Sequence, residues 1–440
     1  MEKGNHNSPF STLHSQFDEI RPYEAGEMKQ AFEDLLNDRQ FNVVLKGFAP
    51  WLPKSVRNGL LRLAFVGIKT PLDFQKRFMK PVVKYIIRKH TDGCSFDDSA
   101  LQGNQISHLD ERYTFVSNHR DIVLDSAFLD VKLFEAGYPT TVEIGIGDNL
   151  LIYPWIKRLV RMNKAFTVRR GLSLRETLTA SQLMSRYIHY AVTQKKENIW
   201  IAQREGRAKD SNDRTQDAVL KMLAMGGPLI ENEESGMENY DMTQDSNVVE
   251  KSQGLHGNHN SQLSVVNSQL LSSLRELNIV PLTISYEYDP CDYLKAQEFQ
   301  QKRDNPAFKK SKQDDLDNMK TGIFGYKGRV VYRASEPINT WIDVLKDLPA
   351  KEFFTVVAQR MDHAIHRGYE LFPCNYIAAD LLSGERRNAD HYTQKDEQRF
   401  EAYLQGQLAK IKLPEKDDAF LRERMLTMYA NPLKNYLAAL

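Results

Sequence analysis

Six short segments rich in β-branched and aromatic residues lie within residues 113–333, and they constrain the fold more than any other feature. They occur at 113–117, 139–146, 165–169, 198–203, 279–287 and 328–333. Helical stretches separate most of them, and the stretch 173–195 opens with Ser173 and Glu176 at the spacing of a capping box. Strands that alternate with helices are typical of an α/β fold. The sequence therefore predicts a layered α/β fold with a largely parallel central sheet flanked by helices.

The chain divides into three predicted regions. Residues 1–100 are expected to form a helical, basic amphipathic N-terminal region, 101–340 the α/β domain, and 341–440 a helical C-terminal extension. The last region carries predicted helices at 350–367, 375–383, 394–411 and 417–438. Residues 231–261 contain seven acids, one lysine and almost no hydrophobic periodicity, which predicts a disordered surface insertion in the α/β domain.

The N-terminal region is locally basic. Between Lys46 and Lys89 there are eleven lysines or arginines and a single acid, Asp73, while the prolines at 50, 53, 71 and 81 are expected to break the segment into short helices. Apolar residues including Trp51 alternate with the basic ones, a combination typical of helices that dock on an anionic membrane surface. A helical subdomain packed on the core with a solvated basic face has the same pattern, so both interpretations stay open.

Global composition narrows the partners and the compartment. The chain has 59 basic and 58 acidic residues, so its charge gives no indication of a nucleic-acid partner. Three widely separated cysteines fit a reducing compartment, and residues 1–16 lack the apolar core of a signal peptide. No apolar run reaches the ~18 residues that a membrane-spanning helix needs. We expect a cytoplasmic protein, peripheral on the inner face of the membrane.

A polar cluster follows the first predicted strand and leads into a helix. It comprises Asn118, His119, Arg120, Asp121 and Asp125. A histidine on a strand-to-helix turn can be held rigidly and still reach a substrate, as a general base must. A nearby carboxylate can fix its tautomer; Asp125 is the first choice for this role and Asp121 the alternative.

Three further polar clusters follow later strands, where ligands of α/β folds gather. They are Gly145–Asn149, Arg169-Arg170-Gly171 and Gln203–Asp210. Arginine matches the oxygens of a phosphate, and glycine lets backbone amides approach it. The alternative is that these arginines pair with nearby acids.

Two histidines near the C-terminal end of the predicted helix 350–367 raise the question of a metal. His363 and His366 are three residues apart, but no third ligand lies nearby in the sequence. We expect two exposed helix histidines and no metal site.

These clusters, in this order, resemble the conserved blocks of the glycerolipid acyltransferases, the superfamily of glycerol-3-phosphate and lysophosphatidate acyltransferases. The matching blocks are His119–Asp125, Gly145–Arg170 with its ending Phe166-Thr-Val-Arg169-Arg170, Glu205-Gly206-Arg207, and Ile279–Glu287. The resemblance covers about 113–340, and 145–170 looks closer to the bacterial glycerol-3-phosphate branch.

Two spacings depart from the family pattern. Five residues rather than four separate His119 from Asp125, and one rather than two separates Glu205 from Arg207. Either Arg204 or Glu205 therefore takes the position of the family's glutamate.

The resemblance implies a direct transfer of a fatty acyl group from an acyl thioester, of coenzyme A or acyl-carrier protein, to a hydroxyl of glycerol-3-phosphate or 1-acylglycerol-3-phosphate. His119 would be the general base and Asp125, or Asp121, would orient it. The expected substrate-binding residues are Asn118, Arg120, Arg169, Arg170, Glu205, Gly206 and Arg207.

The same resemblance implies no cofactor and no metal. Its expected partners are the acyl thioester donor, the glycerol-phosphate acceptor and an anionic membrane surface. Two alternatives remain: an acyltransferase with a non-phosphate lipid acceptor, and a catalytically inactive relative that binds membrane surfaces.

Overall fold

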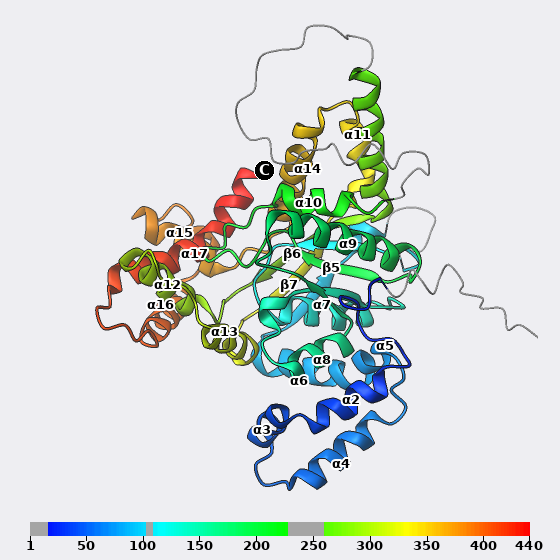
Figure 1. Cartoon of the computed structure of the whole chain (residues 1–440). Helices are drawn as coiled ribbons and strands as arrows, with labels where there is room; N and C mark the ends of the chain where they lie inside the picture. Colours follow the sequence, from blue (N-terminus) through cyan, green and yellow to red (C-terminus); the bar gives the residue numbers. More distant parts are fainter. Residues whose placement is uncertain (1–15, 103–108, 228–258) are drawn as a thin grey trace, which may run out of the picture.

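The predicted strands pair in one central sheet. The structure is a computed structural model that describes residues 16–102, 109–227 and 259–440. In this part of the chain the sheet has seven strands in the order β1-β7-β6-β2-β5-β3-β4 (Figure 1). Their bounds are β1 Cys94–Asp97, β2 Thr114–Ser117, β3 Val142–Gly147, β4 Ala165–Val168, β5 Asn198–Ala202, β6 Ile279–Tyr286 and β7 Val330–Ala334. All neighbours are parallel except β6 and β7, so the layered α/β fold with a largely parallel sheet is confirmed.

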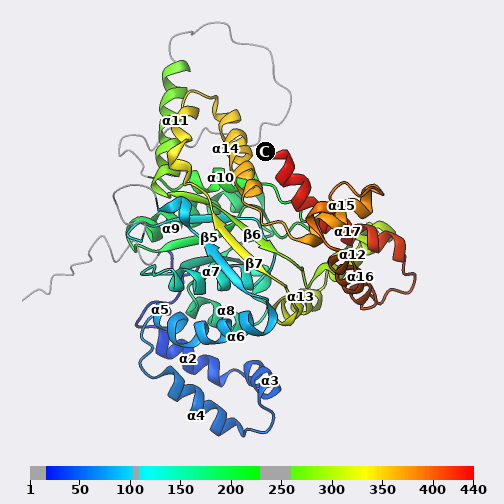
Figure 2. The ribbon, with the colours of Figure 1, turned by 180° about the vertical axis from the view of Figure 1, so that it is seen from behind.

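Helices cover both faces of the sheet (Figures 1 and 2). On one face lie α9 Leu174–Thr193, α10 Asp217–Ala224, α11 His259–Glu276 and α14 Ala350–Arg367, which share an apolar core with the strands. On the other face α6 Lys80–His90 and α7 Leu124–Glu135 form a second core with the sheet. The capping box at the start of α9 is present, since the backbone N–H of Ser173 donates to the Glu176 carboxylate over 2.9 Å.

The N-terminal helices form a separate layer beside α8 Pro154–Met162. They are α2 Met28–Asn37, α3 Arg39–Phe48, α4 Lys54–Phe65, α5 Pro71–Phe74 and a π-helical turn at Gln75–Met79 that runs into α6. Pro53 and Pro71 stand at helix starts as expected, but Pro81 does not break the chain. Pro81 is the second residue of α6 and follows the π-helical turn directly, so the helical backbone continues on both sides of it.

The C-terminal helices pack against a segment inserted between β6 and β7. The segment contains α12 Asp292–Asp304 and α13 Lys312–Phe324, neither of which was predicted. The predicted C-terminal helices are α14, α15 Pro373–Ser383, α16 Gln394–Leu408 and α17 Asp418–Ala438, and the last three form an apolar core with α12. Short 3₁₀ turns occupy Ser99–Leu101, Asp148–Leu150, Ile338–Thr340, Ile342–Leu345 and Ala389–His391.

Two further predictions concern the acidic insertion and the possibility of a membrane-spanning helix. The predicted disordered insertion 231–261 lies outside the described residues from 231 to 258, while its last three residues, 259–261, belong to α11 and correct that end of the prediction. Among the helices of the described segments, none combines the length and the apolarity required to cross a bilayer.

Candidate active site

His119 and Asp125 meet at the carboxyl end of β2. The imidazole Nδ1 lies 2.8 Å from Oδ2 of Asp125, and the histidine side chain is 14% exposed while the aspartate is fully buried. Because Asp125 lies in the first turn of α7, the turn between strand and helix folds it back onto His119 despite the five intervening residues. A carboxylate in contact with Nδ1 orients the imidazole ring and leaves Nε2 as the nitrogen that can act on a substrate.

Backbone amides fix the same oxygen of the Asp125 carboxylate that contacts His119. The N–H groups of Arg120 and Asp121 both donate to the same Oδ2, over 2.7 and 3.1 Å. The tyrosine hydroxyl of Tyr332 donates to the backbone carbonyl of Asp125 over 2.9 Å. These contacts hold one rotamer of Asp125, and through it one orientation of the imidazole.

Asp121, the alternative candidate for orienting His119, instead binds the backbone at the start of α7. Its Oδ1 accepts the backbone N–H groups of Val123 and Leu124, each over 2.8 Å, and so caps the start of α7. Burial, and then the neighbouring charge of Asp125, raise the pKa of Asp121. On its other side Asp121 faces α13 at Gly322, where a Cβ would overlap the carboxylate. The structure therefore places Asp125, not Asp121, against the histidine.

The imidazole rests on an aromatic wall. Trp200 of β5 lies edge-on to the His119 ring with 5.7 Å between ring centroids, and its indole N–H donates to Ser117 over 3.0 Å. Because Trp200 covers one side of the imidazole, a substrate can approach Nε2 only from the other side.

Asn118 and Arg120 flank His119 but turn into the protein. The Asn118 amide exchanges two hydrogen bonds with the backbone of Ile284 in β6, over 2.9 and 2.8 Å, and so continues the pairing of β2 with β6. Arg120 donates to the Tyr369 hydroxyl over 3.3 Å, and its Nη1 lies 3.6 Å from Asp213. Through these contacts both residues hold the loop that carries His119 in place.

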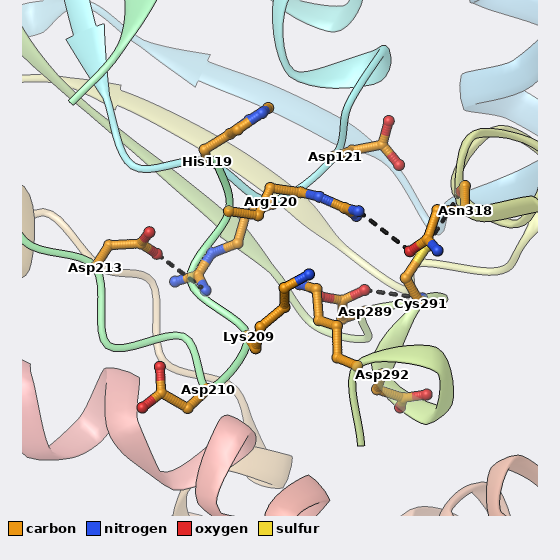
Figure 3. Close-up of polar contacts among 12 residues, drawn as sticks. His119, Arg120, Asp121, Lys209, Asp210, Asp213, Asp289, Cys291, Asp292 and Asn318 are labelled. Atoms are coloured by element: carbon orange, nitrogen blue, oxygen red, sulfur yellow. Dashed lines mark hydrogen bonds and ion pairs between the residues drawn. The ribbon is translucent and has the colours of Figure 1, made fainter. Parts of the chain in front are cut away.

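Asp213 is a buried acid of the site that sequence reasoning missed. Neither of its carboxylate oxygens has a hydrogen-bond partner within the part of the chain described, and Arg120 is its nearest cation. Burial raises the pKa of Asp213, while the charges of Arg120, Lys295 and His119 oppose that rise. Figure 3 shows Asp213 beside His119 and Arg120. Asp213 lies in a loop without periodicity, so the sequence offered no signal for it.

Arg207 follows β5, the strand next to β2. One nitrogen, Nη2, donates to the side chain of Asn318 in α13 over 3.1 Å, while the buried Nη1 has no partner among the described residues. Lys295 and Asp289, of which Asp289 is labelled in Figure 3, form a buried ion pair at 2.5 Å. Burial pushes the pKa of Asp289 up, but the Lys295 ammonium, the charge of Arg207 and the backbone N–H of Cys291 together hold that pKa below its usual range.

Arg170 and Glu205 form an exposed ion pair that connects the loops after β4 and β5, at 3.2 Å. The Arg170 side chain lies over Gly147, where an added Cβ would come within 2.7 Å of Nε. The predicted glycine of the second cluster thus lets the guanidinium cross the end of β3. Arg169 points elsewhere and pairs with Glu19 at the sheet edge.

Gly206 shapes the turn between Glu205 and Arg207. Its φ of +68° is in the left-handed region that glycine adopts without strain. The backbone N–H of Glu205 donates to Gln216 over 2.7 Å, and the next two N–H groups have no partner in the described segments. Successive unpaired amides around such a glycine are suited to an anion.

The structure also contains a second histidine with the neighbours of a Ser-His-Glu triad. His189 Nδ1 lies 2.5 Å from Glu276, and its Nε2 lies 3.2 Å from Ser273 Oγ. However, Ser273 donates to the carbonyl of Ala224 over 2.8 Å and is only 2% exposed, so no substrate reaches it. This arrangement ties α9, α10 and α11 together.

The expectation of two exposed histidines on α14 is half right. His363 is exposed, but His366 is buried and its Nδ1 accepts from Arg214 over 3.0 Å. Burial, with the charge of Arg214, lowers the pKa of His366 to about 4. Within the residues that the structure covers, no group of three or more potential metal ligands occurs.

Comparison with known proteins adds no relative: the chain matches no protein-family model and no curated protein.

Proposed function

We propose that this protein transfers a fatty acyl group from an acyl thioester to a hydroxyl of glycerol-3-phosphate or of 1-acylglycerol-3-phosphate, with His119 as general base. The observation that carries the proposal is the 2.8 Å contact between His119 and the buried Asp125, held by two backbone amides at the carboxyl end of β2. A buried, singly oriented carboxylate behind a partly exposed imidazole is the arrangement that general-base catalysis needs. The resemblance of the surrounding sequence blocks to glycerolipid acyltransferases supplies the substrate class.

In the proposed reaction, Nε2 of His119 takes the proton of the acceptor hydroxyl while its oxygen attacks the thioester carbonyl. The tetrahedral intermediate then collapses: the carbon–sulfur bond breaks, an ester is formed, and the imidazolium returns the proton to the leaving thiolate. Asp125 stabilises the transient imidazolium. The unpaired backbone N–H groups at Gly206 and Arg207 are suitable donors to the oxyanion or to a phosphate.

Two arginines are suited to the acceptor phosphate. Arg207 stands after the strand adjacent to β2; its buried Nη1 has no hydrogen-bond partner among the described residues, and the charges of Asp121 and Asp289 act on the guanidinium. Arg170 is held by an exposed ion pair with Glu205, which contributes little to stability and can exchange for a phosphate. A guanidinium binds two phosphate oxygens at once, so these side chains would both bind and orient the acceptor.

The proposal is tested by incubating the protein with a labelled acyl thioester and, in separate reactions, glycerol-3-phosphate, 1-acylglycerol-3-phosphate and a lipid alcohol without phosphate. We expect labelled ester from one of the two phosphate acceptors and none from the third. Ester from the phosphate-free alcohol alone would replace the proposed acceptor. No ester from any of them, by protein that is folded, would contradict an acyltransferase function.

Replacing Arg207 by methionine is expected to raise KM for the phosphate acceptor about 10- to 100-fold, because a charge-assisted hydrogen bond to phosphate contributes about 1.5–3 kcal/mol. The KM for the acyl thioester should change little. Steady-state kinetics with each substrate varied in turn measure both. Arg169→Met is the matched control, since Arg169 pairs with Glu19 and should leave both constants unchanged. Equal effects of the two changes on KM for the acceptor would contradict a role of Arg207 in binding the acceptor phosphate.

A further inference from the structure

The helices α3 and α4 lie at the end of the N-terminal layer that is remote from the sheet (Figure 1). Residues of both helices and of the chain between them line a cationic pocket. Its volume is about 570 Å³, within the range of pockets that bind small molecules. Four of the residues that line it are basic, and none is acidic. They are Arg39, Lys46, Lys54 and Arg57.

Arg57 is the buried cation of this pocket. It is only 7% exposed, yet no carboxylate lies within ion-pair distance of it among the described residues. Its Nη2 donates to the side-chain oxygen of Asn42 over 3.2 Å, and its buried Nε has no partner. Burying an uncompensated guanidinium is costly. Because no protein anion compensates the buried charge of Arg57, the pocket is suited to bind the anion of a ligand.

The neighbouring acids are engaged elsewhere. Asp38 caps the start of α3 by accepting two backbone N–H groups, and it pairs with Arg158 of α8 at 3.6 Å. Glu33 of α2 pairs with Arg62 of α4 at 2.7 Å. Neither acid lines the pocket, so its positive charge is not neutralised from within.

Exposed apolar side chains occur on the same pair of helices and on the chain that joins them. Seven large ones lie between residues 43 and 66: Val43, Val44, Trp51, Val56, Leu60, Leu63 and Val66. Val43 and Trp51 line the pocket, with Trp51 76% exposed, while residues 56, 60 and 63 share another face of α4 by helical spacing. Apolar side chains with an indole beside basic groups fit the boundary between lipid headgroups and acyl chains.

We infer that the α3–α4 pocket binds the phosphate of an anionic phospholipid headgroup, while the exposed apolar side chains beside it enter the bilayer surface. Arg57 and its cationic neighbours hold the headgroup oxygens. This goes beyond the proposed acyl transfer and does not depend on it, because the site shares no residue with the His119 region.

The test compares vesicle binding by variants of the full chain, measured by co-sedimentation without any substrate. The vesicles are phosphatidylcholine mixed with phosphatidylglycerol, and pure phosphatidylcholine serves as the uncharged reference. Arg57→Gln is expected to weaken binding to the anionic vesicles about 10- to 100-fold, the loss of a charge-assisted hydrogen bond. Arg62→Gln removes the same charge from the same helix but outside the pocket. It should weaken vesicle binding by no more than about fivefold, the effect of losing one basic residue near an anionic surface.

A second pair of variants keeps the test decisive if Arg57→Gln destabilises the helices. Lys46 and Lys54 are exposed and line the pocket, so their joint replacement by glutamine should preserve folding. The matched control replaces Arg62 and Lys69, exposed residues outside it. A larger loss for the pocket pair supports the site. Equal losses, or a wild-type protein that does not bind anionic vesicles, overturn it.

Discussion

Replacing His119 by glutamine is expected to reduce acyl transfer by about 10²–10⁴-fold, the usual contribution of a general base. Glutamine retains a hydrogen-bonding side chain of similar size but takes no proton, so the acceptor hydroxyl must attack without assistance. The contact with Asp125 is local, and the imidazole is at the edge of the core, so the fold should persist. Initial rates at saturating acceptor measure the effect, and thermal unfolding checks the fold.

The control for this change is His363→Gln, because His363 is an exposed histidine on α14 and makes no hydrogen bond or ion pair with His119 or Asp125. It should leave the rate unchanged. Asp125→Asn should lie between the two, since the amide no longer stabilises the imidazolium. A His119→Gln protein with wild-type rates would show that the pair at the end of β2 is structural, and would favour the inactive, membrane-binding alternative.

The sequence was sufficient for the parts of the molecule that depend on local pattern. The strand, turn and helix around His119 are contiguous, so Asp125 was a natural partner only six positions away. The capping box at Ser173 and most strands of the sheet were equally local. β1 was missed because Cys94–Asp97 carries little apolar alternation, and α12 and α13 because their segment is polar with weak periodicity.

Long-range contacts explain the rest. Asn118 and Arg120 looked like substrate ligands beside a catalytic histidine, yet their partners are Ile284 and Tyr369, more than 150 residues away. Arg169 and Arg170 are adjacent in sequence but diverge, one toward Glu19 and the other toward Glu205. Side-chain direction at a strand end depends on which elements surround it, and α13 and the C-terminal helices were outside any recognised block.

The buried pair of Lys295 and Asp289 yields the second large effect. Replacing Lys295 by methionine is expected to lower the free energy of unfolding by about 3–5 kcal/mol at pH 7, because the charge of Asp289 stays buried without its closest cation. Both side chains are less than a tenth exposed, so solvent screens the loss little. Chemical denaturation of wild type and variant at pH 7 measures it.

The pH dependence of this deficit has a definite sign. In the wild type the pKa of Asp289 is held below its usual range, so its stabilisation is present above the unfolded value of about 3.9 and is lost only as the pH falls toward the lowered folded value. Without Lys295, burial dominates and the folded pKa rises, so protonation relieves the penalty as the pH falls. The deficit of Lys295→Met should therefore shrink between pH 7 and about pH 4.

Adding Asp289→Asn to Lys295→Met should recover part of the lost stability, because the second change removes the uncompensated charge while keeping an acceptor for the backbone N–H of Cys291. The double variant should also lose the pH dependence of the deficit. A deficit that is equally large at both pH values, and that Asp289→Asn does not relieve, would mean that the lysine stabilises through its packed methylene groups rather than its charge. In that case Asp289 would be compensated by the neighbouring Arg207, and the ion pair would not be what holds α12 beside the site.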